Sequence, residues 1–372
     1  MTTDIEKIKT PATLLDENLL RSNIRRMTSK SDDFGVAFRP HAKTHKSVKI
    51  WNELSSAGAM GLTVATCEEA KYFMLSSCSD VLVAYPQGNI EIVSELIYLA
   101  QKTHTKITFI FDSVFSLEVL SKAASITGVT VNCFLKVDVG LHRCGVDPCN
   151  PNSIKTAQLA FDDRTINLCG LLSHAGHAYE AKSYEKVSQI AEKELTTLEE
   201  FKECLYKSGI DVRQTSIGST PTLLTETNLS SVTEIRPGNF VFLDLTQVSL
   251  GVAKTSDIAL SVLTSVISVN SSYFIIDAGT KILSADKGAH GSESVKSFGL
   301  AVNIINHRET IEVEKLSEEH GFLPNRGEKL KVGSKLRIFP NHSCVVANLS
   351  HEYKIIAGDM LIDSWSIGGR RR

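Results

Sequence analysis

Two lysines, one arginine and two histidines lie within eight residues in the stretch Arg39-Pro40-His41-Ala42-Lys43-Thr44-His45-Lys46. The stretch follows a short apolar run, and a helical pattern begins after it near Ser47. It is therefore expected where a buried strand ends and a helix begins, which is where α/β folds build their sites. A lysine that is desolvated among other cations is held neutral and can attack a carbonyl. The alternative is a basic surface loop.

Further polar clusters follow later apolar runs. Arg143 comes after the run 130–137, and His174 and Tyr179 come after the run 166–172. Two later turns contain Gly218, Ser219 and Thr220, and Gly238 and Asn239. Each cluster alone has a structural explanation. Together they are expected at the same open end of a barrel, where the strands reach their carboxyl ends. Backbone N–H groups and hydroxyls near the last two strands of a barrel can hold a phosphate there. A nucleophilic lysine beside such a cradle indicates pyridoxal 5′-phosphate, with His174 and Arg143 placed to contact its ring.

A metal-binding pattern occurs late in the chain, in Phe339-Pro340-Asn341-His342-Ser343-Cys344. If the segment is extended, His342 and Cys344 point to the same side. Imidazole and thiolate together suit Zn²⁺, and two protein ligands leave coordination positions open for catalysis. The alternative is a buried cysteine beside a surface histidine. The segment 317–321 offers another polar group for the same region.

Expected strands and helices, which must position these residues, alternate along the chain up to about residue 245. Apolar runs separated mostly by helical patterns imply parallel strand pairing. Eight such units favour a (β/α)8 barrel over an open sheet, because no glycine-rich phosphate turn follows the first strand. The expected strands are 36–41, 61–65, 81–85, 106–111, 130–137, 166–172, 213–217 and 232–242. The expected helices are 47–56, 68–76, 90–102, 116–124 and 184–207.

After this point short β-rich runs and turns replace the helical patterns, which predicts a mostly antiparallel β domain. We therefore expect a cofactor-binding barrel at 15–245 and a β domain at 246–372 that carries the metal motif. The N-terminal segment 1–14 is expected to join the β domain. The expected strands of this domain are 259–269, 273–276, 300–306, 335–339 and 353–356.

The composition is that of an ordinary globular protein, with 372 residues, 42% hydrophobic residues and a net charge of −2. The absence of a Lys/Arg excess argues against a protein that binds nucleic acid. The run Arg370-Arg371-Arg372 is most simply explained as a solvated tail. No apolar run reaches the roughly 18 residues that a membrane span needs. The N-terminal residues lack the apolar core of a signal peptide, and eight scattered cysteines suit a reducing compartment. We expect a cytoplasmic protein.

The lysine segment resembles the pyridoxal-lysine motif of the D-serine dehydratase and D-threonine aldolase family, fold-type III enzymes related to alanine racemase. The resemblance covers nearly the whole chain and combines this motif with the late His-x-Cys. It implies a barrel followed by a β domain and a homodimer with the site near the interface. The other segments that carry it are 10–16, those around Arg143 and His174, 218–222, 234–244, 277–279 and 317–321.

The resemblance also implies roles for individual residues. Lys43 would hold the cofactor as a Schiff base, Arg143 would bond the ring oxygen and His174 would stack on the ring. Tyr179 is the candidate partner of the pyridine nitrogen. The phosphate would be held by Gly218, Ser219, Thr220, Gly238 and Asn239. The metal, Zn²⁺ or another divalent cation such as Mn²⁺, would be held by His342 and Cys344. Phe240 stands where many relatives have tyrosine.

The expected reaction is metal-assisted β-elimination from a D-3-hydroxyamino acid such as D-serine, giving a 2-oxo acid and ammonia. Members that resemble the dehydratases carry His-x-Cys, whereas several aldolases carry His-x-Asp, so Cys344 favours dehydration. Retro-aldol cleavage to glycine and an aldehyde is the main alternative. A racemase needs a second acid/base that the sequence does not identify. A non-enzymatic cofactor-binding protein would lack the β domain. The β-substituent stays open: hydrogen, methyl or carboxylate.

Overall fold

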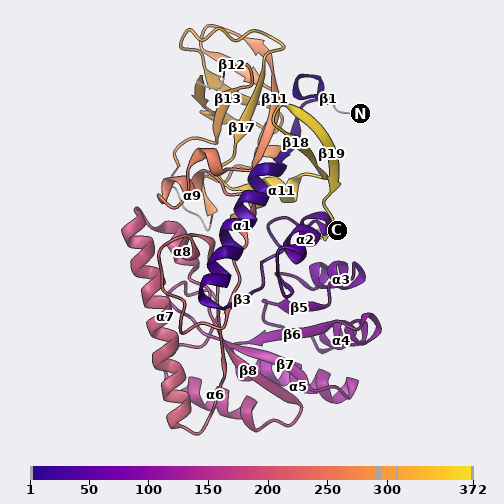
Figure 1. Ribbon diagram of the computed structural model, residues 1–372, viewed down its shortest axis with the longest axis vertical. Helices are drawn as coiled ribbons and strands as arrows, with labels where there is room; N and C mark the ends of the chain where they lie inside the picture. The colour runs from indigo at the N-terminus through magenta and orange to yellow at the C-terminus, as the bar shows by residue number, and fades with distance from the viewer. Residues whose placement is uncertain (1–2, 290–294, 307–308, 370–372) are drawn as a thin grey trace.

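The computed structural model describes residues 3–289, 295–306 and 309–369, so the tail Arg370–Arg372 lies outside the described residues. Two sheets follow one another along the long axis of the molecule (Figure 1). The parallel sheet and its helices, coloured violet to pink, form the lower part, and a mostly antiparallel sheet in orange and yellow forms the upper part. None of the described helices has both the length and the apolar composition needed to cross a membrane.

The lower sheet has eight parallel strands in the order β3-β10-β9-β8-β7-β6-β5-β4. Its two edges meet, because the Ala42 N–H donates to the Thr63 carbonyl at 2.8 Å and the Thr63 N–H donates to the Pro40 carbonyl at 2.9 Å. The predicted barrel followed by a β domain is therefore confirmed. The barrel strands are β3 (Ala37–Phe38), β4 (Leu62–Val64), β5 (Asp80–Val83), β6 (Lys106–Phe111), β7 (Val131–Lys136), β8 (Ile166–Leu172), β9 (Gln214–Ile217) and β10 (Glu234–Ile235).

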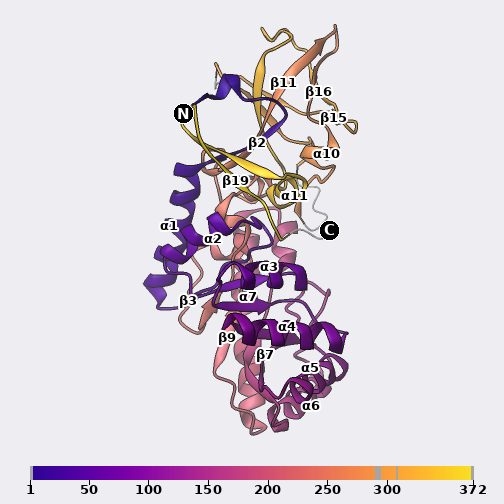
Figure 2. The ribbon, with the colours of Figure 1, turned by 90° about the vertical axis from the view of Figure 1, so that its right-hand side faces the viewer.

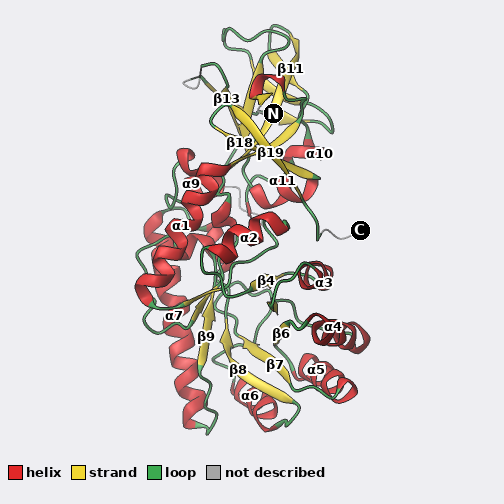
Figure 3. Ribbon diagram, turned by 45° about the vertical axis from the view of Figure 1, so that its right-hand side comes forward, coloured by secondary structure: helices red, strands yellow, loops and turns green. Residues whose placement is uncertain are grey.

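Helices follow the strands and cover the outside of the barrel, as Figure 3 shows for α3 to α6. Side-chain caps fix their starts: Asn89 accepts from the Ile92 N–H before α4, and Ser183 accepts from the Lys186 N–H before α7. The helices of this part are α1 (Glu17–Phe34), α2 (Val48–Ser56), α3 (Cys67–Leu75), α4 (Ile90–Thr103), α5 (Val114–Thr127), α6 (Pro151–Asp162), α7 (Tyr184–Lys207) and α8 (Thr220–Leu223).

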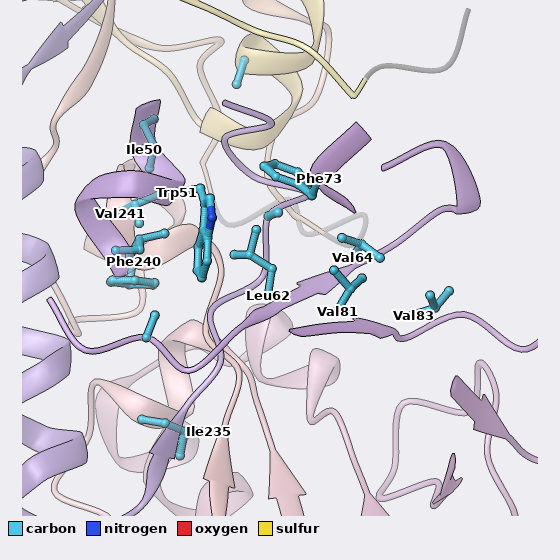
Figure 4. Close-up of a cluster of buried hydrophobic side chains, with 14 of the residues drawn as sticks. Ile50, Trp51, Leu62, Val64, Phe73, Val81, Val83, Ile235, Phe240 and Val241 are labelled. Carbon is cyan, nitrogen blue, oxygen red and sulfur yellow. The ribbon is translucent and has the colours of Figure 1, made fainter. Parts of the chain in front are cut away.

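Apolar side chains from the strands and the covering helices form the barrel core (Figure 4). Trp51 of α2 and Phe73 of α3 are buried together with Leu62 and Val64 of β4. Every residue of β4 is buried, as expected for a parallel strand that is covered on both faces. This is why the barrel strands appear in the sequence as short continuous apolar runs.

The upper sheet includes β2 (Ala12–Asp16), the second strand of the chain, which lies between β18 and β11. Figure 2 shows β2 in this upper part, together with β11 and β19. It pairs antiparallel with β11 and parallel with β18. Helix α1 then carries the chain down to the barrel, so the two parts are connected at both ends of the barrel sequence. The other strands are β1 (Thr3–Asp4), β11 (Leu260–Val269), β12 (Tyr273–Ile276), β13 (Leu300–Asn303), β14 (Thr310–Glu312), β15 (Lys315–Leu316), β16 (Gly321–Pro324), β17 (Lys335–Phe339), β18 (Glu352–Ala357) and β19 (Met360–Ser366).

Several expected elements differ in the structure. The strand expected at 232–242 is reduced to the two residues of β10, and Asn239–Val241 form a 3-10 turn. Pro237 lacks the N–H that would continue the ladder, which accounts for the early end of the strand. Helix α6 was not predicted. The upper part also contains three short helices, α9 (Leu245–Ser249), α10 (Thr280–Leu283) and α11 (Ser343–Leu349), where almost no helical pattern was seen.

Candidate active site

A cavity of about 440 Å³ opens at the carboxyl ends of the barrel strands, and residues of α11 also line it. Barrel residues and residues of the upper part contribute to the same cavity, so the site is formed by both parts of the chain. All the site residues expected from the sequence line it: Lys43, Arg143, His174, Tyr179, Gly218, Ser219, Thr220, Gly238, Asn239, His342 and Cys344.

Lys43 lies in the turn after β3 and is partly buried. Burial lowers the pKa of its amine, and Arg143 lowers it further, while Cys344 acts in the opposite direction. Other residues that line the cavity hold the turn, because the nearby Lys46 pairs with Glu69 at 3.3 Å and donates to Asn348 at 2.8 Å. A fixed lysine whose amine has a lowered pKa is suited to act as a nucleophile toward a carbonyl.

A polar recess suited to an anion lies at the ends of β9 and β10. The Ser219 hydroxyl is buried and has no hydrogen-bond partner within the described chain. A Cβ on Gly218 would come within 2.8 Å of the Arg236 carbonyl oxygen, and one on Gly238 would meet the Thr44 hydroxyl at 3.0 Å. An unpaired buried hydroxyl beside two such glycines fits a phosphate group.

Two members of the expected phosphate set already have partners in this recess. The Thr220 hydroxyl accepts hydrogen bonds from the Gly238 and Phe240 N–H groups at 3.3 and 3.2 Å. The Asn239 amide donates to Asp244 and Ser343, both at 2.8 Å. Its amide nitrogen is therefore turned toward α11, which places Asn239 between the recess and the metal motif.

The residues expected to contact the cofactor ring lie in the loops after β7 and β8. The His174 Nδ1 is hydrogen-bonded to the Gly218 carbonyl, which ties the histidine to the polar recess. Tyr179 is buried in a 3-10 turn, where desolvation strongly raises the pKa of its phenol, and it hydrogen-bonds Thr220. Tyr179 therefore stays protonated and can donate a hydrogen bond.

The expected extended conformation of the His342–Cys344 segment is wrong beyond His342. Helix α11 begins at Ser343, whose N–H donates to the buried carboxylate of Asp244 at 3.0 Å. This carboxylate satisfies one of the N–H groups that a helix leaves free in its first turn. The two side chains are nonetheless hydrogen-bonded to each other, and both line the cavity.

The histidine and the thiol perturb each other. Burial alone would lower the pKa of His342, but hydrogen bonds to Asp286 and Cys344 raise it to about 10. Burial alone would raise the pKa of Cys344, but His342 and the Thr44 hydroxyl, at 3.3 Å from the sulfur, lower it. Once His342 gives up its proton, the imidazole and the thiolate together are a donor set suited to Zn²⁺.

No group of three or more His, Cys, Asp or Glu residues suited to a metal ion occurs in the part of the chain that the structure describes. The residues that were expected near the metal motif at 317–321 do not line the cavity. Glu319 is exposed and pairs with Lys281 of α10 at 2.6 Å. A metal ion on His342 and Cys344 would therefore keep coordination positions for other ligands.

Sequence reasoning missed several charged residues of the cavity, including Lys136, Arg236 and Glu69. Lys136 ends β7, and its burial, followed by the field of Arg236, lowers its pKa to about 7. Arg236 donates to the Ser216 hydroxyl and the Ser173 carbonyl. A charged residue at the end of an apolar strand pattern was the signal that could have identified Lys136 and Arg236.

Comparison with known proteins finds relatives of both parts of the chain. Residues 15–246 match the alanine racemase N-terminal domain, and residues 259–356 match a putative serine dehydratase domain. The chain is 30% identical over 369 residues to D-threo-3-hydroxyaspartate dehydratase of Delftia sp. strain HT23, covering 96% of this chain and 97% of the relative. It is also 30% identical over 380 residues to D-serine dehydratase of Dictyostelium discoideum, covering 96% and 95% of the two chains.

A solved structure of a cysteine-to-alanine variant of D-threo-3-hydroxyaspartate dehydratase, described as the metal-free form, matches with a TM-score of 0.91 at 29% identity. The match covers 98% of both chains. A histidine-to-alanine variant of that enzyme matches with a TM-score of 0.92, and its substituted histidine lies two positions before the substituted cysteine. This is the spacing of His342 and Cys344. The chain therefore belongs to the family of D-serine dehydratases and D-threonine aldolases, pyridoxal phosphate-dependent lyases with the alanine racemase fold.

Proposed function

We propose that this lyase dehydrates a D-3-hydroxyamino acid to a 2-oxo acid and ammonia, using pyridoxal 5′-phosphate and Zn²⁺. The observation that carries the proposal is the pairing of His342 with Cys344 in the cavity that contains Lys43. Thiolate ligands select Zn²⁺ over harder cations such as Mn²⁺. Zn²⁺ is a Lewis acid that assists departure of a hydroxyl group.

The residues of the barrel would bind the cofactor and move the proton. Ser219, Gly218 and Thr220 would hold the phosphate, and His174, Arg143 and Tyr179 would contact the ring. The cofactor, when bound, supplies an electron sink for the charge that develops at the substrate Cα. Lys43 would hold the cofactor until the substrate binds, and its amine, whose pKa is lowered by burial, would then take the α-proton.

The residues of the upper part would act on the β-hydroxyl. By holding Zn²⁺, His342 and Cys344 would place a Lewis acid within the same cavity as the Lys43 amine. Loss of the α-proton and departure of hydroxide from Cβ can then be assisted from the two sides of the cavity. Retro-aldol cleavage would instead require a base on the β-hydroxyl.

Product analysis with D-serine and D-threonine, with and without a chelator, tests the proposal. We expect 2-oxo acid and ammonia, loss of activity after metal removal and recovery with Zn²⁺. The Lys43→Ala variant should be inactive and should lack the cofactor absorbance near ~420 nm that a lysine-bound pyridoxal gives. Glycine and an aldehyde as products would make the enzyme an aldolase. D-serine turnover by Lys43→Ala would contradict the role of this lysine.

A further inference from the structure

The ring of His342 is contacted by a carboxylate from outside the predicted site residues. Its Nδ1 lies 3.2 Å from Oδ2 of Asp286, which belongs to the loop after α10. The His342 side chain is 18% exposed and that of Asp286 is 46% exposed, so the carboxylate reaches the ring from the solvent side. With Nδ1 engaged by Asp286, Nε2 is the nitrogen left for a metal ion.

The loop that carries Asp286 is held in an unusual conformation. Ser284, directly after α10, is buried and has φ 66° and ψ 161°, a region that residues with a side chain rarely adopt. Its hydroxyl accepts a hydrogen bond from the Asp286 N–H at 3.1 Å. Strained residues of this kind persist where the surrounding structure enforces them, often beside functional groups.

Helix α10 is itself fixed to the neighbouring segment 317–321. The Thr280 N–H donates to the Ser317 carbonyl at 2.9 Å, and a Cβ on Gly279 would lie 2.3 Å from the Glu318 carbonyl. The segment that the sequence associated with the metal motif therefore contributes through its backbone, by holding the helix from which the Asp286 loop departs.

We propose that Asp286 is a positioning residue of the metal site, which fixes the His342 ring so that Nε2 faces the ion. The partners of the second ligand are different: Cys344 is contacted by Thr44 at 3.3 Å and by the Asn239 amide at 3.6 Å, both from the barrel. Each ligand is thus oriented from its own side of the cavity. Partners of this kind affect metal affinity about 10–100-fold when they are removed.

The test measures Zn²⁺ affinity of the holoenzyme by competition with a chromophoric chelator. Asp286→Ala should weaken Zn²⁺ binding about 10–100-fold, because the ring is no longer oriented. Asp286→Asn should weaken Zn²⁺ binding less, since the amide oxygen of the asparagine can still accept a hydrogen bond from the His342 Nδ1–H. Asp359→Asn, which removes an exposed carboxylate from the β18–β19 turn, is the matched control and should bind as the wild type does. The cofactor absorbance of each variant shows that the cavity has folded.

The inference rests on the metal site of the proposed function, and the two can fail separately. If wild-type protein binds no Zn²⁺, the metal site itself is wrong. If wild type binds Zn²⁺ and Asp286→Ala binds it within about twofold of wild type, only the role of Asp286 is wrong. If Asp286→Ala loses binding as completely as His342→Ala, Asp286 is a ligand, which also overturns the positioning role.

Discussion

Cys344 is the residue on which the proposed choice of dehydration over retro-aldol cleavage rests. It receives hydrogen bonds from the barrel and lies beside His342, so its thiolate is stabilised before any metal binds. The Cys344→Ala variant should no longer bind Zn²⁺. Its rate of 2-oxo acid formation should fall about 10²–10³-fold, because Lewis-acid assistance is worth several kcal/mol. The cofactor absorbance should persist, since Lys43 is unchanged. Metal analysis and product assays check this, with the exposed Cys149→Ala as control. Full activity without metal would contradict it.

Lys136 should make stability depend on pH. Its pKa is about 7 in the folded protein, against an ordinary value of 10.5, because burial disfavours its charged form. Between these values the unfolded chain binds a proton that the folded protein does not, so the free energy of unfolding rises with pH. The Lys136→Met variant lacks this pH-dependent cost of burying the lysine. Its free energy of unfolding should therefore exceed that of wild type most near neutral pH.

Urea unfolding near neutral pH and about two units higher measures this difference. The advantage of Lys136→Met over wild type should shrink at the higher pH. Lys122→Met, at an exposed lysine paired with Glu118, is the control and should show no such trend. The same pH slope in wild type and Lys136→Met would count against the depressed pKa.

At the residue scale, the sequence identified groups whose types suit chemistry but not the groups that orient them. Lys43, His342 and Cys344 stood out because their spacing has a chemical meaning. Asp286 lies 56 positions before His342, and nothing in its local pattern distinguishes it from a surface aspartate. Its partner is determined by how α10 packs, which is a tertiary property.

At the scale of elements, a buried ion-pair group connects strands that are distant in sequence. Arg39, after β3, contacts Glu234 of β10 at 2.6 Å and Asp80 of β5 at 2.5 Å, and all three side chains are almost fully buried. Glu234→Gln should lower the free energy of unfolding by about 3–5 kcal/mol, because Arg39 loses part of its charge compensation in the interior. Glu53→Gln, which breaks the exposed pair with Arg21, should cost less than about 1 kcal/mol.

Denaturant unfolding of both variants decides the point. If Glu234→Gln and Glu53→Gln lowered the free energy of unfolding equally, the buried ion pairs of Arg39 would not hold the strands together.

The predictability of the elements follows from their burial. Strands such as Lys106–Phe111 and Ile166–Leu172 were located correctly because each is a mostly apolar run whose last residues are buried. Helix α6 was missed because its buried face consists of Ser153, Thr156, Ala157 and Ala160. These small residues give little apolar contrast. Its start signal, Asn150 followed by Pro151, was present in the sequence.

At the scale of the whole molecule, the upper part holds the backbone that carries Lys43. The Tyr353 hydroxyl of β18 donates to the His45 carbonyl at 2.7 Å, and the Gly368 N–H donates to the Lys46 carbonyl at 2.8 Å. Two carbonyls just beyond Lys43 are therefore fixed by the C-terminal part of the chain. His342 and Cys344, at the start of α11, belong to the same part, so one unit positions both the proposed metal ligands and the lysine turn.

Because of this coupling, the Tyr353→Phe variant should lose cofactor affinity as well as stability. The buried His45 carbonyl would lose its donor, which should lower the free energy of unfolding by about 1–3 kcal/mol. Because the same bond fixes the turn of Lys43, cofactor affinity should fall as well. Tyr206→Phe, at an exposed tyrosine of α7, is the matched control and should change neither quantity. Unfolding followed by far-ultraviolet circular dichroism, together with titration of the cofactor, separates the two effects. A variant that loses stability but binds the cofactor normally would show that the bond holds the two parts together without positioning Lys43.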